Sequence, residues 1–366
     1  MTGPGLEKKK RVVVAMSGGV DSTVAAGLLK EQGYEVIGVT MKVFSLPKEI
    51  CLSEELRACC GWQAIEDARQ AAFDLGVAHF VVDFRKEFES SVIADFCREY
   101  SRGRTPNPCV RCNEHIKFGL LAERSKRLGA ELFATGHHAR VAFHRPSGRY
   151  RLLRAADESK DQSYFLYPLT QEQLSRSLFP VGGMLKREVR VLARKWGLRV
   201  ADKPESQEIC FAPLGDYPDF LRKRGNRAFV PGPIKDAAGR VLGEHQGIGR
   251  YTVGQRRGLG IAGAEPLYVV AIDGPGNTVY VGRDEDLLSK TLTASGVNWV
   301  SIESPDRPIR AKARIRSRHE AAGALVTPLK KGRVRVDFDR AQRAVAPGQS
   351  VVFYARGAVL GGGIID

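Results

Sequence analysis

The sequence predicts an α/β fold with a doubly wound parallel sheet, followed by a small central domain and a C-terminal β-barrel. Three observations support this fold class. Short β-branched runs alternate with helical patterns in the first half of the chain. A Gly-rich segment joins the first predicted strand directly to the first helix, and after about residue 216 the apolar runs become short and strand-like. The predicted domains span residues 1–215, 216–285 and 286–366.

The elements follow from local patterns taken in order. Four apolar runs predict the buried strands of the sheet: residues 11–16, 35–42, 78–84 and 131–136. Apolar residues three and four positions apart, stopping at Gly, predict helices over residues 21–32, 63–76 and 113–129. Further patterns predict a hairpin over 140–155, a helix over 186–196, and barrel strands at 309–315, 333–338 and 350–354.

Composition argues against membrane and secreted proteins. The 366 residues are 43% hydrophobic and 27% charged, and no run approaches the ~18 consecutive apolar residues of a spanning helix. The first ten residues contain no apolar signal core. The seven Cys residues are odd in number and all lie before residue 211, unlike a disulfide framework. We therefore predict a cytoplasmic protein without membrane contact, with thiols available for chemistry.

The charge distribution suggests an anionic partner. The net charge is +16, and residues 290–366 carry 14 Lys and Arg against six Asp and Glu, a net charge of +8. A basic C-terminal module is typical of a polyanion-binding surface, although a solvated basic face fits the same numbers equally well.

The strongest local signal is the segment Ser17-Gly18-Gly19-Val20-Asp21-Ser22, between the first strand and the first helix. The two Gly residues allow the backbone to approach a phosphate, and the Ser hydroxyls and the N–H groups of the helix start supply anion donors. Asp21 is suited to the Mg²⁺ that accompanies phosphates. An ordinary Gly-rich turn is the alternative, but the whole segment favours nucleotide binding. The Lys of a Walker loop is absent, which disfavours kinases and GTPases.

This segment resembles the pyrophosphate loop of the ATP pyrophosphatase superfamily, whose fold is adenine nucleotide alpha hydrolase-like. Six further motifs occur in order at residues 105–113, 116–119, 134–140, 160–164, 205–211 and 251–259. Together they resemble the bacterial tRNA-specific 2-thiouridylases over nearly the whole chain. The resemblance implies a sulfur transferase that uses ATP and Mg²⁺ to adenylate the wobble uridine in the anticodon loop of tRNA. It also implies a cysteine desulfurase or a sulfur-relay protein as donor, and we favour a monomer.

The resemblance assigns Cys112 as the nucleophile and Cys210 as the carrier of a persulfide intermediate. On pattern alone, Cys210 is more typical of a packed residue, and the Cys109-x-x-Cys112 pair is more typical of zinc or redox chemistry. Some family members have Asp where this chain has Cys109. That departure leaves open a 4Fe-4S cluster held by Cys109, Cys112 and Cys210. The remaining cysteines match no catalytic motif and are predicted to be structural: Cys51, Cys59, Cys60 and Cys97.

The resemblance also implies the binding residues. For ATP they are Ala15, Met16, Ser17, Gly18, Gly19, Val20, Asp21, Ser22, Met41 and Gly136. For tRNA and the target base they are Asn107, Pro108, Cys109, His137, Lys160, Asp161, Gln162, Arg316, Ser317 and Gln349. The residues from Arg314 to Arg318 alternate basic with apolar or small side chains, which predicts three Arg on one strand face. The family often has Tyr where this chain has Ser317, which puts a stacking contact there in doubt.

Three other functions are possible for a chain with this loop, and each predicts features that differ from those of this sequence. An amide-forming ligase of the GMP or argininosuccinate synthetase type needs an amino-group acceptor site and no paired cysteines. A tRNA 2-thiocytidine enzyme would show two C-x-x-C pairs and no basic barrel. A non-catalytic RNA-binding protein would be expected to have lost the loop residues and the two motif cysteines, all of which are intact here.

Overall fold

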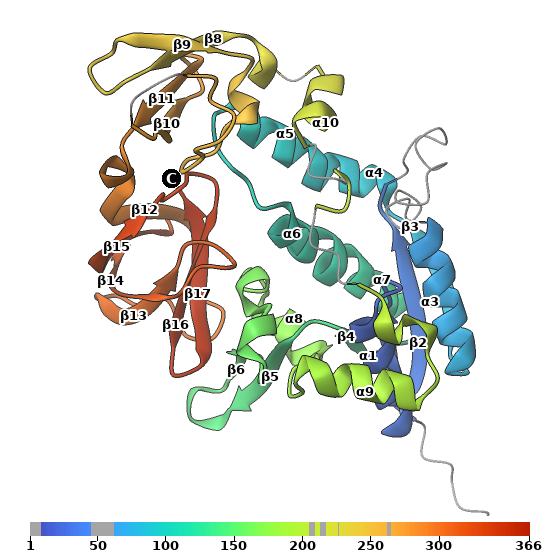
Figure 1. Cartoon of the computed structure of the whole chain (residues 1–366). Helices are drawn as coiled ribbons and strands as arrows, with labels where there is room; N and C mark the ends of the chain where they lie inside the picture. The colour runs from blue at the N-terminus through green and yellow to red at the C-terminus, as the bar shows by residue number, and fades with distance from the viewer. Residues whose placement is uncertain (1–8, 45–61, 205–208, 213–216, 226, 262–264) are drawn as a thin grey trace, which may run out of the picture. The chain divides into compact units, whose positions relative to one another are not determined.

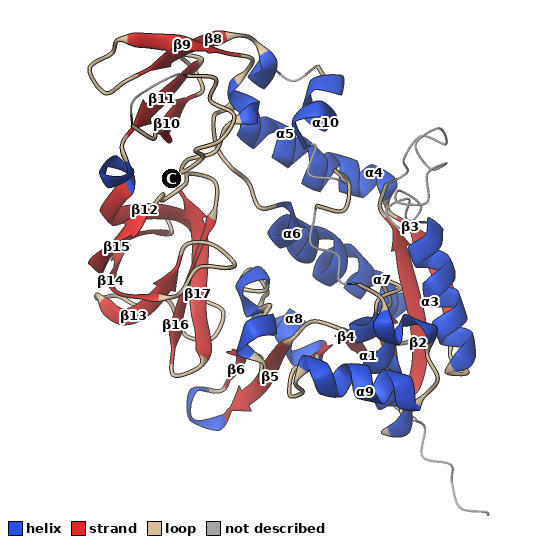
Figure 2. Cartoon of the chain, viewed as in Figure 1, coloured by secondary structure: helices blue, strands red, loops and turns tan. Residues whose placement is uncertain are grey.

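The computed structural model describes residues 9–44, 62–204, 209–212, 217–225, 227–261 and 265–366 (Figures 1 and 2). The chain forms two compact units: residues 1–89 with 112–211, and residues 90–111 with 212–366. Residues 90–111 therefore group with the C-terminal part of the chain. Three cysteines predicted to be structural lie outside the described residues: Cys51, Cys59 and Cys60.

A five-stranded parallel sheet forms the centre of the first unit. Its strands, in the order β3-β2-β1-β4-β7, are Ala78–Asp83, Glu35–Lys42, Arg11–Ala15, Leu132–Thr135 and Ser177–Leu178. On the central strand β1, Val12 is opposite Val36 of β2 and Leu132 of β4. The chain moves outward from β1 to β3 and then returns to add β4 on the other side of β1. The predicted doubly wound sheet is thereby confirmed, and its switch point lies between β1 and β4.

Helices cover both faces of this sheet. On one face, α1 (Val20–Glu31), α3 (Trp62–Asp74) and α9 (Lys186–Lys195) bury small and β-branched side chains against the strands and one another. On the other face lie a π-helical segment (Cys112–Leu121) and α7 (Ala122–Arg127), and the short helix α6 (Pro108–Arg111), which precedes them in the chain, belongs to the second unit. The ring of Phe118, in the π-helical segment, lies 5.5 Å from the ring of Phe133 on β4. Phe133 and its neighbour Ala134 point to opposite faces of the sheet, and Ala134 packs on the face covered by α1 and α3.

Smaller elements complete the first unit. The predicted hairpin is present as β5 (Ala139–His144) and β6 (Arg149–Arg154), with Gly148 at a positive φ of 60° in its turn. The helices α4 (Arg85–Phe88) and α8 (Gln171–Arg176) follow β3 and β6.

The second unit contains a small sheet and a closed barrel. The sheet has the order β10-β11-β8-β9, from strands Tyr268–Asp273, Thr278–Gly282, Gly232–Lys235 and Val241–His245. The barrel strands β12 to β17 are Leu288–Asn298, Ile309–Arg314, Ala322–Leu329, Arg333–Arg343, Ser350–Ala355 and Ala358–Ile365. Pairing of β12 with both β15 and β17 closes the barrel. Two helices, α5 (Ala94–Ser101) and α10 (Tyr217–Lys223), belong to the same unit.

One sequence prediction in the barrel is wrong. Strand β13 ends at Arg314, and the backbone N–H of His319 donates to the carbonyl of Arg316 at 3.1 Å, which closes a turn. Arg316 and Arg318 therefore lie in a turn and not on a strand face with Arg314. No helix in the described ranges is long and apolar enough to cross a membrane.

Gly182 provides a test of packing in the first unit. A Cβ there would lie 1.6 Å from the carbonyl oxygen of Ala139 at the start of β5, whereas a Cβ at neighbouring Gly183 would meet nothing within 4 Å. We expect Gly182→Ala to lower the free energy of unfolding by about 3 kcal/mol or more, because backbone cannot move aside cheaply. Gly183→Ala should stay within about 0.5 kcal/mol of the parent. Urea denaturation measures both, and equal stabilities of the two variants would contradict this packing.

Candidate functional site

The Gly-rich loop after β1 is held in place by close backbone approaches. Gly18 has a positive φ of 71°, and a Cβ there would lie 2.3 Å from the carbonyl oxygen of Ala64. A Cβ at Gly136, just beyond β4, would lie 2.4 Å from the backbone nitrogen of Ser22. Only Gly fits either position without moving backbone. The sequence therefore brings the end of β4 against the start of α1, at the switch point of the sheet.

Hydroxyl groups shape the loop from within. Ser22 Oγ accepts a hydrogen bond from the backbone N–H of Ser17 at 3.1 Å and donates to the carbonyl of Gly19 at 3.1 Å. Thr23 Oγ1 donates to the same carbonyl at 3.0 Å. Gly19, the N-cap of α1, has no side chain to cap the first N–H groups of the helix. Helix N-termini in this state attract anions such as phosphate.

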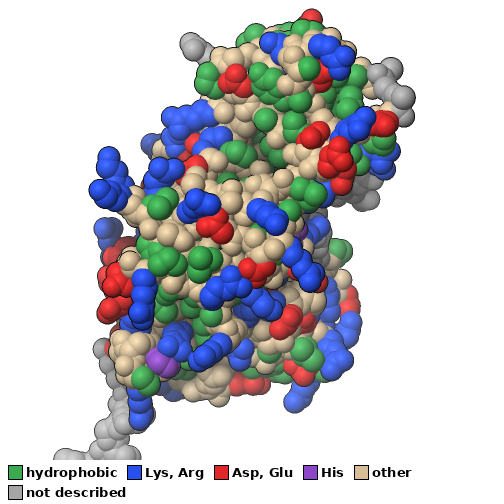
Figure 3. Space-filling view, turned by 90° about the vertical axis from the view of Figure 1, so that its left-hand side faces the viewer, with side chains coloured by type: hydrophobic (Ala, Val, Ile, Leu, Met, Phe, Trp, Pro, Cys, Tyr) green, Lys and Arg blue, Asp and Glu red, His purple; other side chains and the backbone are tan. Residues whose placement is uncertain are grey.

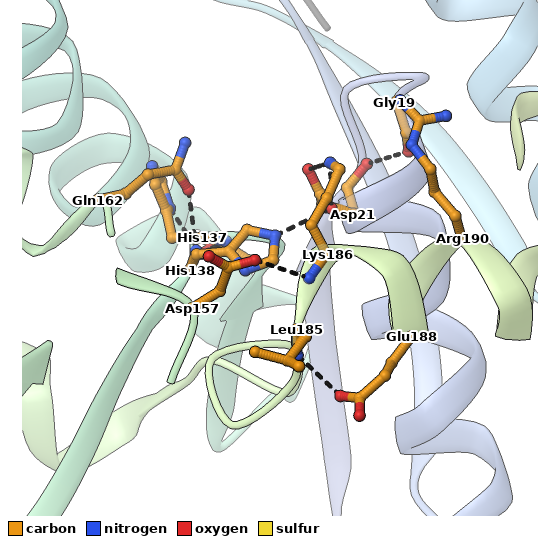
Figure 4. A network of polar contacts seen from close by, with 12 residues as sticks. Gly19, Asp21, His137, His138, Asp157, Gln162, Leu185, Lys186, Glu188 and Arg190 are labelled. Carbon is orange, nitrogen blue, oxygen red and sulfur yellow. Dashed lines mark hydrogen bonds and ion pairs between the residues drawn. The ribbon is translucent and has the colours of Figure 1, made fainter. Parts of the chain in front are cut away.

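Asp21 is the centre of a polar network beside this loop (Figure 4). Lys186 Nζ donates to both carboxylate oxygens, at 2.7 and 2.6 Å, and His138 Nε2 lies 3.1 Å from Oδ1. The side chains of Lys186 and His138 are only 9% and 3% exposed, against 27% for Asp21. Burial alone would raise the pKa of Asp21, but the hydrogen bonds from His138 and Lys186 outweigh it and hold the pKa below its usual value.

Two loops fix the hydrogen-bonding partners of Asp21. The backbone N–H of Lys186, at the start of α9, donates to Asp157 Oδ2 at 3.0 Å. The backbone N–H of His138 donates to Gln162 Oε1 at 2.8 Å, and the backbone N–H of Gln162 donates back to the carbonyl of His138 at 2.8 Å. The network therefore joins α1, the end of β4 and α9 (Figure 4).

A second cation secures the loop from another side. Lys203 Nζ donates to the carbonyl of Gly18 at 3.0 Å and forms an ion pair with Asp67 on α3. Lys203 comes seven positions before Cys210 in the sequence. The loop is thus tied to the chain segment that leads to Cys210.

Sequence reasoning missed five of these residues: His138, Asp157, Lys186, Lys203 and Asp67. One signal was available for Lys186, because a Lys at the first position of a helix faces the positive end of the helix dipole and needs an acidic partner. No local signal pointed to Lys203 or Asp67.

The other residues predicted to bind ATP differ in how far their side chains are exposed. Ser17 is exposed, whereas the Met16 side chain is 2% exposed and belongs to the core between the sheet and its helices. Only the backbone of Met16 lies at the loop, and its carbonyl accepts from Thr40 Oγ1 at 2.8 Å. Ala15 ends β1, and Met41 is half-buried on β2 opposite Val82.

His137, predicted to face tRNA, is half-buried. Its ring lies 5.9 Å from the ring of Phe118 and 6.3 Å from that of Phe179, and Nδ1 lies 2.7 Å from Thr135 Oγ1. Burial, followed by the charge of Lys117, lowers the pKa of His137 well below its usual value. His137 is therefore a neutral group at pH 7.

The two predicted catalytic cysteines belong to the first unit, and Cys109 belongs to the second. Cys112 is half-buried at the start of the π-helical segment, and Cys210 is exposed. Cys109 is exposed on α6. Among the residues that the structure describes, no group of three or more His, Cys, Asp or Glu side chains could hold a metal ion. The predicted three-cysteine cluster therefore stays a prediction.

The predicted tRNA segment 160–162 is built into the first unit. The Asp161 side chain is 1% exposed and accepts hydrogen bonds from the backbone N–H groups of Ala155 and Ser163, at 3.2 and 3.1 Å. Gln162 holds His138, as described above. Lys160 is half-buried. Asp161 and Gln162 thus have structural partners within the first unit.

In the second unit, the barrel holds the loop predicted to receive the target base. Gln349 Nε2 donates to the carbonyls of Thr105 and Pro106, at 2.9 and 3.4 Å. Asn107 Oδ1 accepts from the backbone N–H of Val110 at 3.4 Å, at the start of α6. Pro108 is buried beside the exposed Cys109.

Arg316, also predicted to contact tRNA, donates to the carbonyl of Ala344 and, at 3.5 Å, to that of Val253. Ser317 beside it is half-buried. Lys and Arg side chains are spread over the surface in Figure 3, with fewer Asp and Glu side chains among them.

Known protein families match nearly the whole length of the chain. Residues 10–213 match the tRNA methyl transferase HUP domain, 218–283 the tRNA methyl transferase PRC-barrel domain, and 289–365 the aminomethyltransferase beta-barrel domain. The chain is 51% identical to the tRNA-specific 2-thiouridylase MnmA of Geotalea uraniireducens, over 98% of this chain and 96% of that protein. It is 52% identical to the protein of the same name from Geobacter metallireducens, over 98% and 97%.

The Asp21–Lys186 pair yields a stability prediction. Lys186→Met removes the closest cation from a largely buried carboxylate, and we expect the free energy of unfolding to fall by about 3 kcal/mol. Asp21→Asn/Lys186→Met should recover part of this loss, because neither charge is then left alone. The matched control is Arg194→Met, which breaks the exposed ion pair with Asp202 and should change little. Urea denaturation followed by Trp fluorescence measures all three variants.

The ion pair between Asp21 and Lys186 also makes the stability of the folded protein depend on pH. Because the pKa of Asp21 is lowered in the folded protein, its contribution to stability is complete above the unfolded carboxyl pKa of about 3.9 and is lost as the pH falls through the folded value. The stability difference between the parent and Lys186→Met should therefore shrink below about pH 4. A difference that stays constant from pH 7 to pH 3 would contradict the pairing.

Proposed function

Since the chain belongs to the tRNA-specific 2-thiouridylase family, we propose that it catalyses ATP-dependent 2-thiolation of the wobble uridine of tRNA. The observation that carries this proposal is the near full-length similarity to these enzymes. Two features of the chain support it: the loop at the switch point of the sheet is intact, and both motif cysteines are present. A ligase of the same superfamily would need neither cysteine.

We assign ATP binding to the loop and its surroundings. The uncapped N–H groups of α1 and the hydroxyl of the exposed Ser17 are donors suited to phosphate oxygens, whereas the Ser22 hydroxyl already donates to the Gly19 carbonyl and shapes the loop. Asp21 is an oxygen ligand suited to Mg²⁺, which would neutralise phosphate charge at this site. Mg²⁺ and Lys186 would then be alternative cations for the same carboxylate, so metal binding would leave the Lys186 ammonium available to a phosphate. Adenylation forms a bond from the uridine O2 to the α-phosphorus and releases pyrophosphate.

We assign the sulfur step to the two cysteines. The terminal sulfur of a Cys210 persulfide attacks C2 of the adenylated uridine, and the C2–O2 bond breaks as AMP leaves. The Cys112 thiolate then attacks the Cys210 sulfur, which breaks the persulfide S–S bond and leaves the transferred sulfur on the base. The two cysteines end as a disulfide, and an external thiol reductant must restore them. A persulfide from a cysteine desulfurase or a relay protein reloads Cys210.

The substrate is assigned to residues of the second unit. The Asn107-Pro108-Cys109 loop and the barrel residues Arg316 and Ser317 would contact the target base and the tRNA, and an anticodon loop allows a base to be unstacked at low cost. Because the described residues do not gather three metal-binding side chains, we derive no step through an iron–sulfur cluster. We further propose that the protein acts in the cytoplasm as a monomer.

Cysteine variants test this function. With unmodified tRNA, ATP, Mg²⁺ and a persulfide source, mass spectrometry of the nucleosides should detect 2-thiouridine for the parent. Cys112→Ser and Cys210→Ser should reduce it at least 1000-fold, because neither can complete the sulfur step. The matched control is Cys97→Ser, a half-buried cysteine outside the catalytic motifs, which should retain activity.

Two further readouts make the outcome decisive. Both catalytic variants should still release pyrophosphate and bind tRNA, because adenylation precedes sulfur transfer. Iron analysis of the anaerobically purified parent should find less than one iron per chain, and a stoichiometric cluster would overturn the persulfide route. If the parent neither binds tRNA nor releases AMP, the proposed function is wrong.

A further inference from the structure

The β5–β6 hairpin carries an unusual concentration of positive charge. Residues 132–156 contain no Asp or Glu, while the hairpin within them contains five Arg: Arg140, Arg145, Arg149, Arg151 and Arg154. None of these residues is needed for the ATP or sulfur chemistry assigned above. The hairpin therefore has a charge without an assigned role.

The strand register gathers the basic side chains on one face. His144 is opposite Arg149 and Ala142 is opposite Arg151, and directly opposed residues of an antiparallel pair point to the same side. Arg140 lies two positions before Ala142 and so shares this face. Arg145 is exposed in the turn that joins the strands.

Part of this charge has no acidic partner. Arg154 pairs with Glu158 and Asp161. Arg140 Nε donates to the carbonyl of Arg154 at 2.8 Å, which fixes the side chain without neutralising it. For Arg145 and Arg151, no ion pair is recorded with any residue in the described ranges. A cluster of this kind repels itself unless an anion binds.

We propose that this basic hairpin face binds the sugar-phosphate backbone of the tRNA substrate. The inference rests on the proposed function. Arg guanidinium groups fit phosphate oxygens in a bidentate manner, and contacts of this kind position a nucleic acid without reading its sequence. A phosphate chain is preferred to an acidic protein because the face is a narrow row of Arg along two short strands. The surface lies in the same unit as the nucleotide loop and both catalytic cysteines.

The variant Arg145→Gln/Arg151→Gln tests the proposal through salt dependence. Affinity for tRNA falls as salt rises, and each lost phosphate contact should make the slope of log affinity against log salt less steep by about 1. The slope of the double variant should therefore be less steep than that of the parent by about 2. Affinity for transcribed tRNA at low salt should fall about tenfold or more. Thiolation should show a raised KM for tRNA with kcat unchanged, since the lost contacts hold substrate and transition state alike.

The matched control is Lys195→Gln/Arg199→Gln, which removes two exposed positive charges from another surface of the same unit. Its salt slope and KM should equal those of the parent. An equal loss in the control, or an unchanged slope in the hairpin variant, would overturn the proposal. So would normal tRNA binding combined with slower sulfur delivery from a persulfide-loaded donor protein, which would indicate a protein-docking face. Failure of the parent itself to bind or thiolate tRNA would instead contradict the proposed function.

Discussion

The partly buried ion pair between Asp21 and Lys186 is the interaction on which the site depends. The helix dipole stabilises a carboxylate at the start of α1. Burial of the same carboxylate would push it towards its neutral form. Lys186 and His138 reverse that effect, and they can do so only because α9 and the end of β4 are brought to the same place. The charge of Asp21 thus requires that α1 be packed against two segments whose partner residues lie 117 and 165 positions away in sequence.

Backbone sterics and electrostatics act on the same loop in different ways. Gly18 and Gly136 allow contacts that any Cβ would prevent, but a missing Cβ supplies no attraction. The attraction comes from Lys186 on Asp21 and from Lys203 on the Gly18 carbonyl. Because Lys203 also pairs with Asp67 of α3, the loop is fixed from both sides of α1. The result is a preorganised set of N–H and hydroxyl donors, which lowers the entropic cost of binding a polyphosphate.

The parts of the structure that could be predicted are those determined by local sequence. The strand patterns and the Ser17–Ser22 loop identify the parallel sheet and its switch point, because side-chain period and Gly placement are local properties. Lys186 and Lys203 could not be assigned from spacing, since their partners lie 165 and 136 positions away. The strand predicted through Arg318 was wrong because a turn ends β13 at Arg314, and no Gly or Pro marks that turn.

The division of the chain separates two tasks. Residues 90–111 lie within the N-terminal half of the sequence but are held by the barrel. Arg104 donates a hydrogen bond to the carbonyl of Ile365 at 3.0 Å, and the backbone N–H of Thr105 donates to the carbonyl of Pro347 at 2.8 Å. The loop predicted to receive the base is thus part of the basic barrel unit, whereas the Gly-rich loop and both cysteines predicted to be catalytic belong to the other unit. The proposed role of the basic hairpin face would give the nucleotide unit its own contact with the RNA. Two weak sites on linked units would then bind the same polyanion, and their linkage would raise the overall affinity without requiring a large interface in either unit.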